Sequence, residues 1–331
     1  MNFKMSSEFI TDVGELIRIL GLSGAVCSDV VLAGYSLLVP RDFVELMEVG
    51  NLSDPLLLQV LPQIVEGRND AGFLDNPFGE KINAKSSVLK KYCGRALLVT
   101  TRRCGIHCRF CFRRHILRSS VESQGGCNVD IGCGESDFGL DIGGAIDLIR
   151  LDKSIGEVIL SGGDPLVQSD EQIEKVLDYI EKIPHVKRLR IHSRFPVVMP
   201  KRITERLNFV LMRSKPVYLV LHVNHPNELS DEFISRLRIL SAPVILSQTV
   251  LLRGINDDVE VLAKLFEKLA DNRIIPYYLH QLDRVAGAGH FEVNIVEGCK
   301  IMKNLRERLS GYAIPRYVQE TAGENHKKIL F

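Results

Sequence analysis

The chain has 331 residues, of which 45% are hydrophobic and 25% charged, a balance typical of a globular protein with enough apolar material for a large core. Its formal net charge of +1 gives no general reason to expect nucleic acid or a membrane as a partner. It has no apolar run near the ~18 residues of a membrane helix, and no signal-peptide core follows Met1. Eight cysteines in so long a chain do not make a secreted disulfide framework, so we expect a cytoplasmic protein.

The first part of the chain carries helical patterns. Apolar side chains recur at helical spacing over residues 7–21, and two further helices are expected over residues 40–47 and 54–61. Turn-forming residues follow at 76–79. We therefore expect residues 1–90 to form a helical N-terminal region that packs on the rest of the protein.

Beyond residue 90, short apolar runs alternate with helical patterns. Helices are expected after Ser169, which begins a capping box, after Pro200, Ser230 and Asn256, and over residues 292–309. Each apolar run is short and continuous, as a strand buried on both faces should be. The six runs are residues 96–101, 157–161, 188–192, 217–223, 244–250 and 276–282.

This alternation predicts the fold class. Parallel neighbours need a crossover, usually a helix, so strands alternating with helices predict a parallel sheet in an α/β protein. Six units are too few for a complete eight-stranded barrel, and we expect a partial (β/α)6 barrel over residues 91–290. A C-terminal helix and tail are expected over residues 291–331. A flat, doubly wound sheet is the alternative, and in both folds the chemistry gathers at the carboxyl ends of the strands.

One segment, residues 118–140, breaks the alternation. It is rich in Gly, Ser and Asp and contains Cys127 and Cys133. A loop of this length is usually a lid or is disordered. We interpret its two cysteines as free thiols rather than metal ligands, and the role of the insertion stays open.

Three cysteines stand close together directly after the first predicted strand. Cys104, Cys108 and Cys111 follow one another at intervals of four and three, so their thiols can converge on one bound object. Such spacing suits zinc or an iron–sulfur cluster. No clean partner for a fourth zinc ligand is near, whereas a [4Fe–4S] cluster on three cysteines leaves one iron open. We favour the cluster over a zinc knuckle and over three unrelated buried cysteines.

A second candidate motif, Ser161, Gly162, Gly163 and Asp164, follows the second strand. Its two glycines let a ligand approach the backbone closely. A plain turn is the ordinary interpretation of two glycines after a strand. The motif indicates a binding site only in combination with the three cysteines that follow the preceding strand.

The cysteine spacing, with Phe110 before the last thiol, resembles the signature of radical S-adenosylmethionine (SAM) enzymes. Residues 188–198, 247–256, 276–283, 310–315 and 320–328 point to one family among these enzymes. From about residue 70 onward, the chain is similar to the lysine 2,3-aminomutase family. The segments at residues 192–196 and 277–283 most resemble sequences of the branch that supplies (R)-β-lysine for β-lysylation of elongation factor P (EF-P).

The resemblance implies three cofactors: a [4Fe–4S] cluster, SAM and pyridoxal 5′-phosphate (PLP). It assigns the cluster to Cys104, Cys108 and Cys111 as metal ligands. It assigns the methionyl amino group of SAM to the segment of Ser161, Gly162, Gly163 and Asp164, with Asp164 as an acceptor.

PLP is attached through a lysine amine, which the resemblance places at Lys327. Here Asn325 and His326 replace the more usual small residues, and Lys328 follows at once, so Lys328 is the alternative. A solvated basic tail is the commoner fate of two adjacent lysines. Three further residues match family positions around PLP: Arg95, Arg194 and Gln248.

The resemblance also implies which residues bind the two ends of the substrate. Arg113 matches the arginine that binds the α-carboxylate. Asp283 and Glu320 match the acids that hold the ε-ammonium, although Glu320 is an aspartate in the lysine aminomutases that define the family.

The implied activity is isomerisation of L-lysine to (R)-β-lysine by intramolecular amino transfer. It implies an external electron donor and a functional link to EF-P and its lysyl ligase. Catabolic lysine or glutamate 2,3-aminomutase is one alternative, although glutamate would bring its own carboxylate to Asp283 and Glu320. A non-catalytic iron–sulfur or zinc protein is an alternative of another class. The oligomeric state, a homo-oligomer included, the reductant, the turnover rate and the mode of product release stay open.

Overall fold

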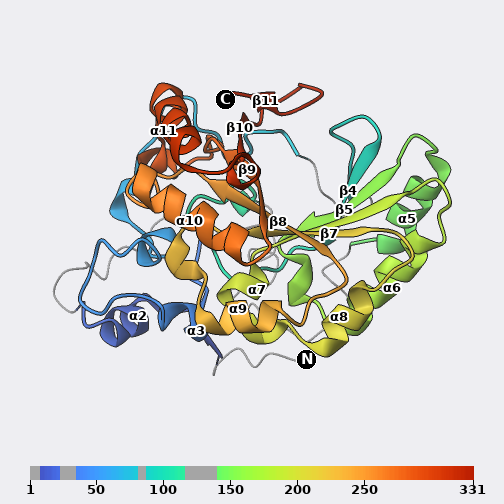
Figure 1. The fold of residues 1–331 in the computed structure, drawn as a ribbon, viewed down its shortest axis with the longest axis horizontal. Helices are drawn as coiled ribbons and strands as arrows, with labels where there is room; N and C mark the ends of the chain where they lie inside the picture. Colours follow the sequence, from blue (N-terminus) through green and yellow to red (C-terminus); the bar gives the residue numbers. More distant parts are fainter. Residues whose placement is uncertain (1–7, 23–34, 81–86, 116–139) are drawn as a thin grey trace.

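The computed structural model describes residues 8–22, 35–80, 87–115 and 140–331, and a nine-stranded sheet forms its centre (Figure 1). The sheet has the order β11-β10-β9-β8-β7-β6-β5-β4-β3. The strands from β4 to β10 run parallel, and β3 (Val88–Leu89) and β11 (Lys328–Ile329) add one antiparallel strand at each edge. The parallel strands are β4 (Arg95–Thr101), β5 (Glu157–Gly162), β6 (Arg188–Ser193), β7 (Val217–His222), β8 (Val244–Val250), β9 (Ile275–His280) and β10 (Arg316–Gln319).

The six predicted strands are confirmed as β4 to β9, with bounds that differ by at most two residues. Strand β10 was not predicted because it is short and mixed in character. Only Tyr317 and Val318 are buried in it, while Arg316 is exposed, so it forms no apolar run. The two-residue edge strands carry no periodic signal at all.

The winding of the sheet distinguishes the two predicted architectures. The parallel strands lie in the sheet in the same order as in the sequence. With right-handed crossovers, each connecting helix then falls on the same face, which curves the sheet around its other face. A doubly wound sheet instead reverses its strand order at a switch point. The partial α/β barrel is therefore confirmed, and β3 and β11 of the described chain leave it open, because they do not pair with each other.

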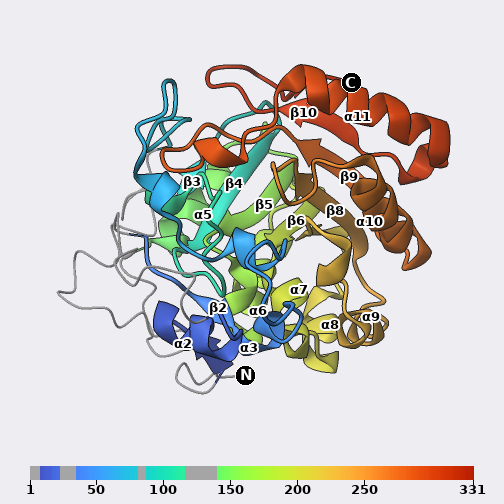
Figure 2. The ribbon, with the colours of Figure 1, turned by 90° about the vertical axis from the view of Figure 1, so that its left-hand side faces the viewer.

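Each described connection between neighbouring parallel strands contains a helix of seven or more residues along the outside of the curved sheet (Figure 2), and the connection from β6 to β7 also contains the short α7 (Phe195–Val198). The predicted caps at Ser169 and Ser230 are confirmed by side-chain hydrogen bonds to the helix backbone. Pro200 opens only a short 3-10 turn, and the next helix begins after Thr204, whose Oγ1 accepts from Leu207 N. The helices are α5 (Ile142–Leu151), α6 (Asp170–Glu181), α8 (Glu205–Leu211), α9 (Asp231–Leu237), α10 (Val259–Asp271) and α11 (Ile295–Arg308).

The N-terminal region is less helical than expected. The helix predicted over residues 7–21 is α2 (Val13–Ile19), because Phe9 and Ile10 form strand β1 and pair with β2 (Val39–Pro40). The other two expected helices are α3 (Arg41–Val44) and a 3-10 turn (Leu57–Gln59).

One buried apolar cluster joins the N-terminal region, the barrel and α11, with Leu16, Leu160 and Met302 as members from each. The division at residues 90 and 290 stays a prediction. Cys127 and Cys133 lie outside the described residues, as does nearly all of the 118–140 segment. Within the described parts, no helix combines the length and apolar character needed to cross a membrane.

Candidate functional site

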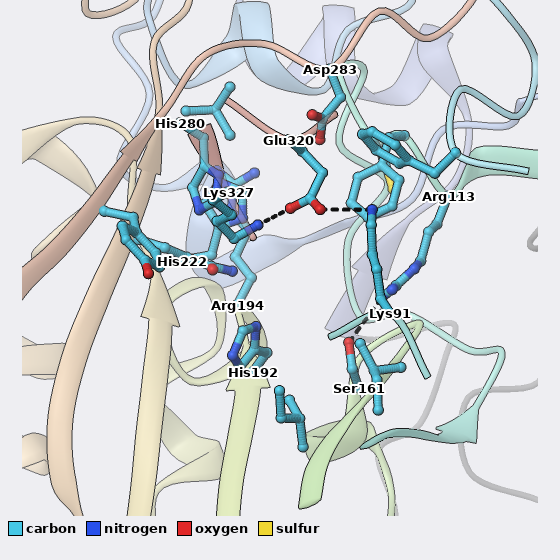
Figure 3. A pocket seen from close by; sticks show the side chains of 18 of the residues that line it. Lys91, Arg113, Ser161, His192, Arg194, His222, His280, Asp283, Glu320 and Lys327 are labelled. Atoms are coloured by element: carbon cyan, nitrogen blue, oxygen red, sulfur yellow. Dashed lines mark hydrogen bonds and ion pairs between the residues drawn. The ribbon is translucent and has the colours of Figure 1, made fainter. Parts of the chain in front are cut away.

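A cavity of about 820 Å³ lies inside the curved sheet and reaches the carboxyl ends of its strands. Its walls come from segments far apart in the sequence, from Phe78 to Ile329 (Figure 3). Every residue that the sequence assigned to the site lines this one cavity. They are Arg95, Cys104, Cys108, Cys111, Arg113, Ser161, Gly162, Gly163, Asp164, Arg194, Gln248, Asp283, Glu320 and Lys327. Lining the cavity does not by itself establish the role expected of each residue.

The loop from Cys104 to Cys111 is anchored through the residues between its cysteines. His107 N donates to Leu38 O, and its ring stacks on Tyr35 with 4.9 Å between centroids. Arg109 is 1% exposed and makes a bidentate contact to Glu66, from Nε at 2.8 Å and Nη2 at 2.6 Å. His107 and Arg109 thus point into the N-terminal region, while the cysteines, Ile106 and Phe110 line the cavity.

Glycines let this loop pack closely against its neighbours. A Cβ at Gly105 would overlap the ring of Phe195, and one at Gly163 would overlap the carbonyl of Arg103. Gly163 N donates to Thr101 O over 2.8 Å, so the turn after β5 is bonded to the chain that leaves β4. The sequence predicted a close approach at Gly163. The observed approach is by the backbone of the cysteine loop.

The three thiols have the chemistry that an iron–sulfur cluster requires. Burial raises the pKa of each thiol, that of Cys111 to about 11. Neighbouring thiols add to the rise at Cys104 and Cys111, whereas Arg194 opposes the rise at Cys108. A bound metal therefore has to displace their protons. Among the described residues, no three His, Cys, Asp or Glu side chains converge as a single metal ion needs. A cubane does not require that convergence, since its three thiolates bind three different iron atoms, and the donor set fits it.

Asp164 and Arg194 already have partners in this structure. Asp164 accepts four hydrogen bonds, from Ser193 Oγ and from the backbone N–H groups of Leu166, Arg194 and Phe195. These use the roughly four acceptor positions of a carboxylate, so Asp164 orders the turns that follow β5 and β6. Its expected contact with SAM stays a prediction.

Arg194 lies at the cysteine end of the cavity. Its Nη1 donates to Cys108 Sγ at 2.8 Å, and its Nη2 donates to Gln59 at 2.7 Å and Glu228 at 3.3 Å. Glu228 is fully buried and forms an ion pair with this guanidinium. Arg194 therefore joins the cysteine loop to Gln59 and Glu228, and its expected place around PLP stays a prediction.

Two carboxylates lie at the other end of the cavity. Glu320 accepts from the ammonium groups of Lys327 and Lys91, the latter at 2.7 Å, and from the hydroxyl of Tyr92 (Figure 3). Asp283 is half-buried on the same cavity wall, and desolvation raises the pKa of its carboxyl to about 7, with Lys327 opposing the rise and Glu320 adding to it. Glu320 thus accepts ammonium groups here, and Asp283 lies close enough to feel the charge of Lys327.

The region around Lys327 fits a phosphate-bearing aldehyde such as PLP. Four more cationic side chains line the same cavity: Arg95, Arg190, Arg316 and Lys328. His192 Nε2, also on the cavity wall, is buried without a hydrogen-bond partner among the described atoms. Lys327 is half-buried with its amine in the cavity, whereas Lys328 is exposed on strand β11, which favours Lys327 over its neighbour.

Several cavity residues were not assigned from the sequence. His192, His222 and His280 stand near the ends of β6, β7 and β9, and burial lowers the pKa of each ring, so all three are neutral. Applying the strand-end rule to every polar residue would have found them. Glu80 and Lys91 had no such signal, because they precede the first parallel strand.

Comparison with known proteins gives several relatives. The L-lysine 2,3-aminomutase of Escherichia coli (strain K12) is 39% identical over 334 residues, which cover 98% of this chain and 92% of that protein. The enzyme of the same name from Haemophilus influenzae is 40% identical over 299 residues, with 89% and 84% covered. That from Clostridium subterminale is 36% identical over 288 residues, with 86% and 66% covered. No protein-family model matches the chain.

The fold and these similarities define the class of protein, an isomerase of the radical SAM family. The chain belongs to the L-lysine 2,3-aminomutase family, as the sequence resemblance predicted.

We predict that replacing Cys104, Cys108 or Cys111 by alanine abolishes cluster binding. The visible absorption and iron content of anaerobically reconstituted protein measure this. Cys299→Ala is the matched control, since Cys299 is half-buried, its Sγ donates to Leu330 O at 3.6 Å, and it is not among the residues that line the cavity. Equal iron content in wild type and Cys108→Ala would contradict the assignment.

We predict that borohydride reduction of PLP-loaded protein leaves a pyridoxyl label on Lys327. Peptide mapping locates the label, with Lys328→Ala expected to keep it and Lys327→Ala to lose it. A label recovered on Lys328 instead would move the attachment site by one residue.

Proposed function

We propose that this chain converts L-lysine to (R)-β-lysine, using a [4Fe–4S] cluster on Cys104, Cys108 and Cys111, SAM, and PLP on Lys327. One observation carries the proposal. A single cavity holds a guanidinium beside the three cysteines, two carboxylates at its far end, and a lysine amine that contacts one of those carboxylates. Lysine has the matching shape, with a carboxylate at one end and an ammonium at the other.

The two ends of the cavity suit the two ends of the substrate. Arg113 follows the last cysteine by two residues and lines the cavity, so it can bind the α-carboxylate near the cluster. Glu320 already accepts two ammonium groups, from Lys91 and Lys327. Once Lys327 holds PLP, its place at Glu320 falls to another ammonium, which we assign to the substrate.

Bound cofactors would supply a carbon radical, from SAM and the cluster, and a π-system, from PLP, that together permit the amino group to migrate. The chain's own residues hold the substrate at both ends, so that one carbon stays opposite the radical source. Neutral His192, His222 and His280 present hydrogen-bonding groups without adding charge to this wall. Apolar walls from Phe78, Phe110 and Phe112 exclude water, which would otherwise weaken the charged contacts.

We also propose that the product serves β-lysylation of EF-P in the cytoplasm, together with a lysyl ligase and an external reductant. The sequence segments at residues 192–196 and 277–283 support membership of this branch of the family. Glutamate is disfavoured as a substrate, because Asp283 and Glu320 would face its side-chain carboxylate.

Anaerobic reconstitution with iron, sulfide, PLP, SAM and dithionite tests the proposal directly. We expect L-lysine to yield (R)-β-lysine, identified by chromatography against standards. L-Norleucine has a side chain of similar length without the ε-ammonium, and L-glutamate carries a carboxylate there instead. Both are expected to be inert because the carboxylates of Asp283 and Glu320 would lack the ammonium of the substrate. Norleucine turning over as fast as lysine would contradict the assigned roles of Asp283 and Glu320.

The pKa of Asp283, about 7, gives the proposal a pH dependence. Below this pH the carboxyl takes up a proton and loses its attraction for the substrate ammonium. We expect the KM for lysine to rise roughly tenfold between pH 8 and pH 6, as a single group of this pKa dictates. Asp283→Asn is expected to bind lysine weakly across the range and to keep both cofactors. A wild-type KM for lysine that stays unchanged from pH 8 to pH 6 would show that Asp283 does not bind the ε-ammonium of the substrate.

A further inference from the structure

The guanidinium of Arg113 has three hydrogen bonds within the protein. Its Nε and Nη2 donate to the two carboxylate oxygens of Glu80 at 2.8 and 3.0 Å. Its Nη1 donates to Ser161 Oγ at 2.9 Å. An arginine has five N–H donors, so one N–H remains on each of Nη1 and Nη2 for a further acceptor such as a carboxylate.

Glu80 is held by its own local structure. Asn76 Nδ2 donates to Glu80 O at 2.9 Å, and Glu80 N donates to Asn76 Oδ1 at 3.0 Å, which closes a ring between the two residues. The Phe78 ring between them packs edge-on against Phe112 and lies 3.9 Å from Lys91 Nζ. The backbone of Glu80 is therefore fixed by the turn at residues 76–80, and these bonds do not involve Arg113.

The same turn is tied to the ammonium end of the cavity. Leu74 pairs with Val285, two residues after Asp283, and Leu74 N donates to Arg284 O at 2.9 Å. Lys91, which contacts Phe78, is also bound to Glu320. Residues 74–80 thus link the groups assigned to the two ends of the substrate.

We infer that Glu80 is a positioning residue for substrate recognition, which fixes Arg113 by one edge so that its two remaining N–H donors bind the substrate carboxylate. The inference rests on the proposed function and deepens it. The side chains of Glu80 and Arg113 are about 10% exposed, so the pair is nearly dry. Removing the acid would leave a buried cation uncompensated and free to turn.

The opposite interpretation is that Glu80 occupies the place of the substrate carboxylate and must leave before lysine binds. It would require breaking the ring with Asn76 or swinging the Glu80 side chain out of a bidentate contact. The two interpretations predict opposite changes in lysine affinity when the charge of Glu80 is removed.

The test measures binding to PLP-loaded, anaerobic protein by titration calorimetry, without turnover. We expect Glu80→Gln to weaken L-lysine binding by about tenfold or more, the scale of a charge-assisted contact. L-Lysinamide, in which a neutral amide replaces the carboxylate, is expected to bind wild type and Glu80→Gln within about twofold of each other. Glu80→Asp keeps the charge on a shorter side chain, and its affinity for lysine is expected to lie between the two. Glu297→Gln, which removes an exposed acid paired with Arg253, is the matched control and should leave both ligands unchanged.

Each other outcome overturns the inference. Tighter lysine binding by Glu80→Gln would make Glu80 a competing occupant, and unchanged binding would make it irrelevant to the carboxylate. Equal losses for lysine and lysinamide would indicate general damage to the cavity, which circular dichroism and the Glu80→Asp variant would check. Absence of lysine binding by the wild-type chain would overturn the proposed function as well, whereas the preceding outcomes leave that function intact.

Discussion

The buried pair of Arg109 and Glu66 determines where the cysteine loop can lie. Both side chains are at most 5% exposed, and the guanidinium also donates to Tyr35 O at 2.9 Å. Losing one partner of such a pair typically costs ~3–5 kcal/mol, because a charge is then left buried alone. Arg109 stands between Cys108 and Cys111, so the same contact that stabilises the fold also sets the position of two thiols. The N-terminal region is in this way part of the site, although it supplies none of the assigned ligands.

Several of the charged residues that line the cavity are paired with other charged residues of the protein. At the cysteine end, Arg194 is paired with Glu228, and Arg113 with Glu80. At the far end, Glu320 is shared by two lysines and a tyrosine. Buried charges are tolerated only when they are paired or neutralised. Any charged ligand of this cavity must therefore exchange contacts with ions that already have partners in the protein.

Sequence reasoning predicted the strands β4 to β9 because each is a continuous apolar run, and it brought the assigned residues to one cavity because parallel strands share their carboxyl edge. It did not predict β10, whose buried residues number only two. Local sequence also could not show how the side chains are paired. The contact of Arg113 with Glu80 joins residues 33 positions apart, and that of Arg194 with Gln59 joins residues 135 apart. Such contacts depend on how the N-terminal region folds over the barrel, which no periodic pattern encodes.

The order of the strands in the sheet also has a consequence for how the protein is made. The cysteines follow the first parallel strand, while Glu320 and Lys327 follow the last one, β10, on the opposite side of the open barrel. Chains begin to fold from the N-terminal side during synthesis. The loop that carries the three cysteines can therefore form while the ribosome is still translating, whereas Lys327 is added after every other residue assigned to the site. The half of the cavity that the cysteines line is thus synthesised well before the half that holds Glu320 and Lys327.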